Sequence, residues 1–136
     1  PKAIDKVRLL NRMLKNKKNP LPAPNYVEEI KRQISTEGIR TINEELKKTK
    51  SAAEKIRLNE EKIYLIDNSG WSRSQRFLAK NQTYNALYSI HSQIGNDNKA
   101  AQALEKCTRF FSAYQKTLQF NPEYRRRQAY EEWEYK

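Results

Sequence analysis

The feature that most constrains the fold is a stripe of apolar residues at helical spacing between positions 39 and 67. The stripe alternates steps of three and four residues and is interrupted by polar residues only at Thr49 and Glu60; its members are Ile39, Ile42, Leu46, Ala53, Ile56, Ile63 and Ile66. A single seam of this kind is typical of a helix that packs lengthwise against its neighbours. We therefore predict one helix of about 28 residues over positions 39–67.

Shorter segments with the same periodicity surround this seam, and the chain has only three Gly and five Pro to interrupt them. Asn25 is a candidate N-cap, Gly38 is expected to end or kink the helix that follows it, and Ser72 with Gln75 forms a capping-box pattern. Asn121 and Pro122 are typical of a further helix start. The further predicted helices span 3–15, 25–38, 72–94, 98–119 and 122–136.

Short turns between long helices favour antiparallel neighbours, so we predict an all-α chain built as an up-and-down four-helix bundle. The bundle is expected to occupy residues 25–136. Residues 1–24 are expected to form a basic N-terminal arm, with a short amphipathic helix and a proline-rich linker.

The positive charge of the chain is concentrated in this arm. Residues 1–24 contain seven Lys or Arg and one acid, so they carry more than half of the net charge of +11. Such a segment favours an anionic partner, which charge alone leaves open between nucleic acid, an acidic lipid surface and an acidic protein face. No apolar run approaches the roughly 20 residues that a membrane-spanning helix requires.

The sequence offers little for catalysis. His91 is the only histidine and Cys107 the only cysteine, and both lie at or near the predicted packed faces of different helices. A catalytic pair also requires an orienting third group and an open cleft, so a structural role is the better interpretation of both residues. We expect no enzyme activity, no metal site and no cofactor.

Residues 65–94 resemble the PsbQ family, the small extrinsic subunits of photosystem II on the lumenal side of the thylakoid. The resemblance rests on Leu65-Ile66-Asp67, a three-residue gap, Trp71, and then Gln75, Leu78 and Tyr84 at the family's spacing. It implies a four-helix bundle with a flexible N-terminal segment, and it is compatible with the algal members and the similar extrinsic subunits of diatoms and red algae. Trp71, Leu78 and Tyr84 then have structural roles, with the Trp71 ring closing the end of the bundle at a turn.

The function that the resemblance implies is indirect. A PsbQ-like subunit would be peripheral to the thylakoid membrane in the chloroplast lumen, bound to the photosystem II core and other extrinsic subunits. It would stabilise the oxygen-evolving complex and help it to retain calcium and chloride without providing metal ligands. The expected electrostatic docking groups are Arg8, Arg12, Lys15, Lys17, Lys18, Arg125, Arg126 and Arg127.

Two alternatives remain open from the residues alone. The charge and the interleaved Tyr124 and Arg125 to Arg127 would also suit an organellar RNA-associated or ribosomal protein. No recognised nucleic-acid motif accompanies them, so nucleic acid is the less favoured partner. The other alternative is a structural subunit of another thylakoid complex.

Overall fold

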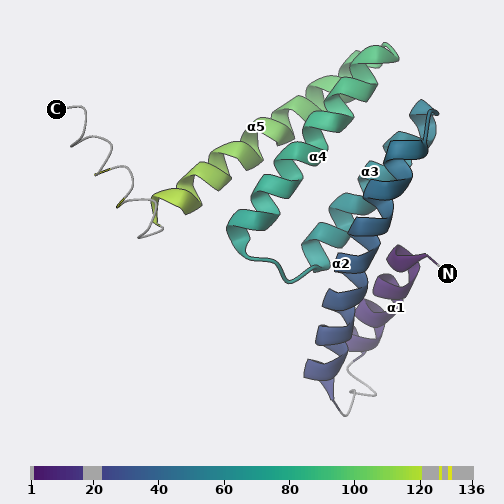
Figure 1. Cartoon of the computed structure of the whole chain (residues 1–136), viewed down its shortest axis with the longest axis vertical. Coiled ribbons are helices and arrows are strands. Elements are labelled where there is room, and N and C mark those ends of the chain that lie inside the picture. Colours follow the sequence, from purple (N-terminus) through teal and green to yellow (C-terminus); the bar gives the residue numbers. More distant parts are fainter. Residues whose placement is uncertain (1, 17–22, 121–125, 127–128, 130–136) are drawn as a thin grey trace.

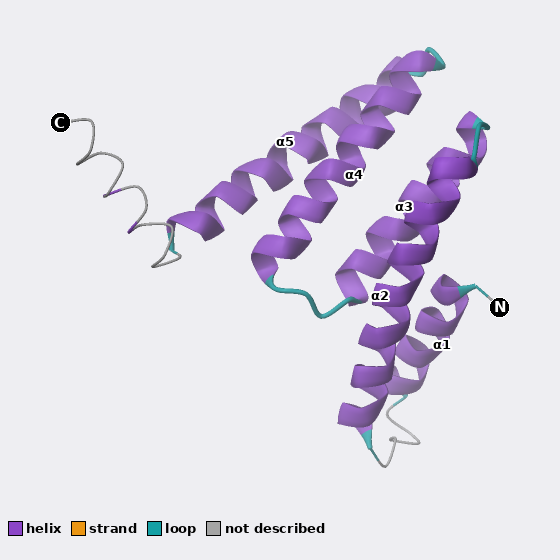
Figure 2. Ribbon diagram, in the orientation of Figure 1, coloured by secondary structure: helices purple, strands orange, loops and turns teal. Residues whose placement is uncertain are grey.

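The computed structural model describes residues 2–16, 23–120, 126 and 129, and in these ranges the ordered elements are all helices. Consecutive helices run up and down (Figures 1 and 2). The prediction of an all-α chain is therefore confirmed. The helices are α1 (Ala3–Lys15), α2 (Pro24–Lys48), α3 (Ala52–Asn68), α4 (Arg73–Gln93) and α5 (Asp97–Gln119).

The main core lies where α1, α2 and α3 pack together. Its buried members are Ile4, Val7, Ile39, Ile42, Leu58, Leu65 and Ile66. Burial of an aliphatic side chain of this size contributes about 1.5–3 kcal/mol. Because α1 supplies two of these side chains, Ile4 and Val7, this helix is part of the core.

Helix α2 does not end at Gly38, contrary to the prediction. Gly38 is buried in the middle of α2, and a Cβ atom built on it would lie 2.6 Å from the Cβ of Ala3 and 2.9 Å from Cδ1 of Leu65. Its role is close packing: the missing side chain lets α1 and α3 approach the backbone of α2. Asn25 is also not the N-cap, because the helix begins with Pro24 at its first position.

The single helix predicted over 39–67 is wrong, because the chain breaks at residues 49–51. Thr49 is extended at the C-cap of α2, and Ser51 is the N-cap of α3, where its Oγ accepts a hydrogen bond from the backbone N–H of Glu54. This pattern of Ser followed by Glu three residues later is a helix-start signal. The break resets the helical phase, so that Leu58 and Leu65, outside the predicted stripe, become fully buried.

The corner between α3 and α4 is built from polar backbone contacts and one ring. The Oγ of Ser69 donates to the carbonyl of Ile66 and accepts from the N–H of Trp71, and Gly70 takes the left-handed conformation with φ of 73°. Trp71 is half-buried against the main core. Ser72 and Gln75 then form the predicted capping box of α4.

Helices α4 and α5 form a long antiparallel hairpin, visible beside the α1–α3 group in Figure 1. Phe110 of α5 stacks on Tyr84 of α4 with ring centroids 5.7 Å apart, and Asn81 donates to the carbonyl of Cys107 at 2.9 Å. Among the described helices α5 contacts only α4, and α4 contacts α3. The four-helix bundle is therefore not confirmed, since a closed bundle would also place α5 against α2.

The helix predicted at 122–136 falls outside the described residues, apart from two isolated positions. None of the helices in the described ranges has both the length and the apolar character needed to cross a membrane.

Candidate docking surface

The exposed face of α1 carries a shallow basic hollow of about 490 Å³. Arg8, Arg12 and Lys15 line it together with Asp5 and Asn11 of α1 and Tyr64 of α3. The three cations lie at spacings of four and three residues, which places them on one side of a helix. They were predicted as docking groups, and the structure brings them together around one site.

A polar network fixes α1 against α3 at the floor of this hollow. Asn11 donates through Nδ2 to the hydroxyl of Tyr64 at 2.9 Å and to Oδ1 of Asn68 at 3.0 Å. Asn68 in turn donates to the backbone carbonyl of Tyr64 at 2.8 Å. Asn11 interrupts the apolar stripe of α1, and these partners explain why a polar residue occupies that position.

Arg8 lies over the ring of Tyr64, with its guanidinium carbon 5.4 Å from the ring centroid. A cation in this position is attracted by the negative face of the ring, by about 0.5–1 kcal/mol at an exposed site. The contact keeps the guanidinium beside the hollow while its N–H groups stay available. Arginine N–H groups in such a fork bind carboxylate or phosphate oxygens in pairs.

The ion pairs in the described part of the chain leave the three cations of this hollow unpaired. No ion pair in the described part of the chain involves Arg8, Arg12 or Lys15. Several cations elsewhere in the chain form ion pairs with described residues, although Lys48, Lys50 and Lys55 do not; the pairs are Lys31–Glu28, Arg32–Glu29, Arg40–Glu37, Lys47–Glu44, Arg57–Glu54, Arg57–Glu61, Lys80–Asp67 and Arg109–Glu105. The described lining of the hollow therefore has three cations against one acid, Asp5, and this net positive charge attracts anionic partners.

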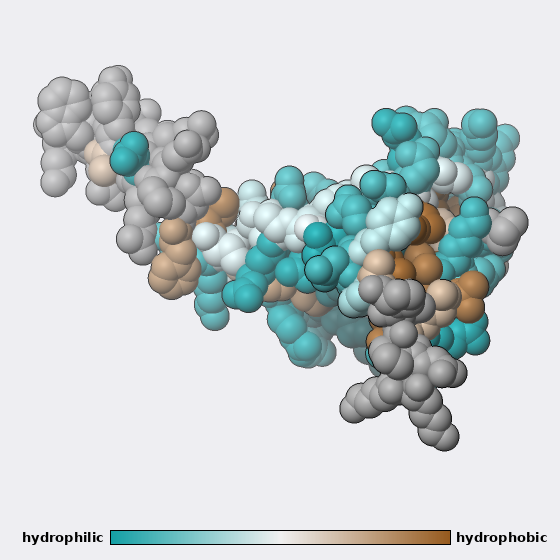
Figure 3. Space-filling view, turned by 90° about the horizontal axis from the view of Figure 1, so that it is seen from below, coloured by the Kyte–Doolittle hydropathy of each residue, from teal (hydrophilic) through white to brown (hydrophobic). Residues whose placement is uncertain are grey.

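Two apolar side chains are exposed on the outer side of α1. Leu9 is 51% exposed and Met13, one turn further, is 38% exposed. Figure 3 shows that hydrophobic residues, in brown, are exposed among hydrophilic ones on the face of the molecule seen from below. An apolar pair next to unpaired cations gives the surface both an electrostatic and a hydrophobic means of contact.

Of the remaining predicted docking residues, the structure describes only Arg126. Lys17, Lys18, Arg125 and Arg127 lie outside the described residues, and Arg126 is exposed. Of the predicted structural residues, Trp71 lies at the α3–α4 corner, Leu78 is half-buried on α4, and Tyr84 stacks on Phe110. Sequence reasoning missed Tyr64 and Asn11, of which only Asn11 left a signal, as a polar residue in an apolar stripe.

No family model, curated protein or solved structure matches this chain. The resemblance of residues 65–94 to the PsbQ family therefore gains no support from these comparisons and stays a prediction. What is known of the docking surface rests on the charges and contacts of the chain itself.

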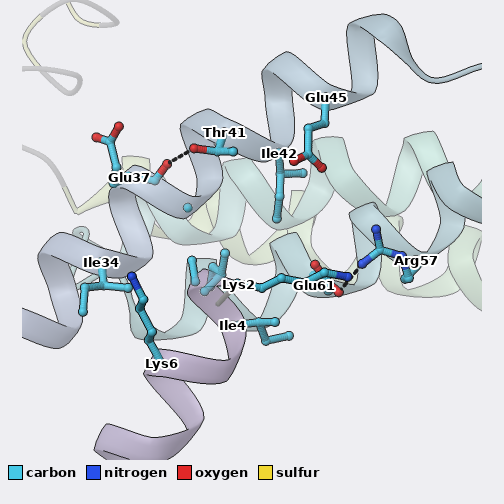
Figure 4. A pocket seen from close by; sticks show the side chains of 13 residues that line it. Lys2, Ile4, Lys6, Ile34, Glu37, Thr41, Ile42, Glu45, Arg57 and Glu61 are labelled. Carbon is cyan, nitrogen blue, oxygen red and sulfur yellow. Dashed lines mark hydrogen bonds and ion pairs between the residues drawn. The ribbon is translucent and has the colours of Figure 1, made fainter.

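A second hollow, of about 520 Å³, lies at the other end of α1 and is shown in Figure 4. Its charges are balanced. Lys2, Lys6 and Arg57 share the lining with Glu37, Glu45 and Glu61. Arg57 bonds to Glu54 and Glu61, and its guanidinium lowers the pKa of the Glu54 carboxyl. This hollow thus shows no charge preference for a partner.

The candidate catalytic residues do not meet within the described helices. Cys107 faces Asn81, and His91 lies ten residues further along α4, about 15 Å at the rise of an α-helix. Among the described residues, no group of His, Cys, Asp or Glu is arranged to hold a metal ion.

Proposed function

We propose that this protein is a non-catalytic subunit that docks on an acidic face of a larger complex through the exposed surface of α1. The observation that carries the proposal is that Arg8, Arg12 and Lys15 line one hollow beside Tyr64 and form no ion pair with any described residue. Exposed ion pairs contribute about 0–1 kcal/mol each, so several must act together to steer and orient binding.

The resemblance of residues 65–94 to PsbQ makes the lumenal side of photosystem II the complex to test first. In this form of the proposal the subunit covers and rigidifies partner loops of the oxygen-evolving complex and so helps it to retain calcium and chloride. The chain provides no metal ligands in this mechanism. The chain acts by covering the partner with its helices, and α1 fixes where they lie on it.

The test is rebinding to salt-washed photosystem II membranes from the organism that encodes the protein. We expect saturable binding that is lost at high salt, because the attraction between exposed charges is screened over about 10 Å at 0.1 M salt. Rebinding should restore oxygen evolution. Replacement of Arg8, Arg12 and Lys15 by Glu should weaken binding at least tenfold and leave helicity unchanged.

The matched control reverses three other cations that have no ion pair among the described residues, Lys48, Lys50 and Lys55. It changes the net charge by the same amount and should alter binding less than twofold. If both variants lose affinity equally, net charge and not the α1 surface governs binding. If the wild-type protein does not bind these membranes and instead sediments with ribosomes, the RNA-associated alternative replaces the proposal.

We retain the four-helix bundle as part of the proposal for the docked protein. The up-and-down order of α2 to α5 supports it, and contact between α2 and α5 would complete it. Spin labels at the exposed positions 43 and 112 would report the distance between these helices. A distance that does not shorten on docking would contradict closure.

A further inference from the structure

A groove of about 340 Å³ lies between α3, α4 and α5, separate from the docking surface on α1. Ile63 of α3, Leu87 of α4 and Ala103 of α5 line it and provide apolar contact area. The volume falls near the lower end of the range of about 300–1,000 Å³ that is common for small-molecule sites. A ligand here would touch three helices at once.

The α5 wall of this groove is cationic. Lys99 and Lys106 are two turns apart, about 10.5 Å along the helix axis, and Gln102 lies between them on the same wall. The ammonium of Lys106 lies 5.4 Å from the centroid of the Tyr84 ring, which holds it over the groove. Neither lysine forms an ion pair with any described residue, so both charges are available to a ligand.

The α4 wall contains a buried polar atom that lacks a partner. His91 is 5% exposed and lines the groove, and its Nδ1 has no hydrogen-bond partner among the described residues. A buried polar atom without a partner lowers stability, and a partner supplied by a ligand removes that cost. The groove therefore offers a ligand a hydrogen-bonding partner, the unsatisfied Nδ1 of His91.

The remaining polar groups of the groove set the sign and position of the ligand's charge. Glu60 on α3 is the one acid among the lining residues, against the two lysines of α5. Burial raises the pKa of the Tyr84 hydroxyl, which stays a neutral donor at physiological pH. An anionic group is thus favoured on the α5 side, with the uncharged part of the ligand towards α3.

We propose that this groove binds a small organic acid, with its carboxylate between Lys99 and Lys106 and its apolar part against Ile63, Leu87 and Ala103. The lysines supply charge-assisted hydrogen bonds, which are about twice as strong as neutral ones. The site is independent of docking through α1.

The test is a titration of the full chain, labelled with ¹⁵N and ¹³C, with octanoate followed by NMR. Octanoate should bind saturably and shift the resonances of the groove residues, the ring of His91 included. Octylamine, which has the same chain and the opposite charge, should bind at least tenfold more weakly. Acetate, which has the charge without the chain, should cause no saturable shifts at the same concentrations.

Variants separate the lysines from general charge effects. Replacement of Lys99 and Lys106 by Gln should weaken octanoate binding at least tenfold. The control replaces two exposed lysines outside the groove, Lys50 and Lys116, by Gln; it changes the net charge by the same amount and should leave binding within twofold. Circular dichroism should show equal helicity in all three proteins.

Three results would each overturn the proposal. One is equal binding of octanoate and octylamine, which would mean that only apolar contact operates. The second is unchanged octanoate affinity in the double lysine variant. The third is an absence of resonance shifts in α3, α4 and α5 when octanoate is added. None of these results bears on the α1 surface, because its test uses different residues and a different partner.

Discussion

Replacement of Gly38 by Ala tests the packing of α1 against the core. In an exposed helix this change is stabilising by up to about 1 kcal/mol, because Ala has the higher helix propensity. Here the new Cβ would lie 2.6 Å from the Cβ of Ala3, whereas non-bonded carbons prefer about 3.5–4.0 Å. The Ala3 Cβ cannot rotate away, so α1 must shift by roughly 1 Å.

The expected result is a net loss of stability. Overpacking in a well-packed core costs about 1–3 kcal/mol, so Gly38→Ala should destabilise the protein by about 1–2 kcal/mol after the gain in helix propensity. Urea unfolding followed by circular dichroism measures the difference, as a lower midpoint with an unchanged slope. The control Asn43→Ala, at an exposed position of the same helix, should be neutral or slightly stabilising.

A second variant separates the clash from other effects. Replacing Ala3 by Gly in the Gly38→Ala protein removes the close Cβ contact, so the double-mutant cycle should show a favourable coupling energy of at least 0.5 kcal/mol. If Gly38→Ala alone raises the unfolding midpoint, α1 does not pack on α2 in this way. Gly38 would then only lower the stability of α2 through the low helix propensity of glycine.

The other predictions concern single side chains. Ser51→Ala removes the side-chain cap of α3 and should cost about 1 kcal/mol in urea unfolding, whereas Ser51→Asp should be neutral. Trp71→Ala should cost about 2–3 kcal/mol, less than the 3–5 kcal/mol of a fully buried ring, because Trp71 is half-buried; a loss below 1 kcal/mol would place the ring outside the core contact. Burial raises the pKa of Tyr84, so the folded state holds this proton more tightly, and stability should fall as the pH rises above about 10. Tyr84→Phe should reduce this alkaline loss, and an identical pH profile in the variant would contradict the burial argument.

The sequence predicted best what local interactions decide. The bounds of α1 and the capping box of α4 follow from residues within one or two turns of each other. The break between α2 and α3 was also encoded locally, in Ser51 and Glu54. It was missed because the apolar residues keep steps of three and four on both sides of the break. The break nevertheless changes which positions of α3 face the core.

What the sequence could not predict depends on contacts between distant segments. Arg8 and Tyr64 are 56 positions apart, and nothing near either residue indicates that one lies on the other. The lack of room for a side chain at Gly38 is likewise decided by Ala3 and Leu65. The basic residues of α1 were found from their charge, but their shared hollow required the packing of α1 on α3.

The attachment of the α4–α5 hairpin through α3 alone has a consequence for cooperativity. Among the described helices, α5 packs only on α4, and α4 joins the α1–α3 group only through α3, so the hairpin can separate from that group at a single interface. We expect unfolding in sub-global steps, with α1–α3 and α4–α5 as separate foldons. Native-state hydrogen exchange should then give two levels of amide protection, divided near Gly70, and a docked partner that bridges both foldons would raise the lower level towards the higher one.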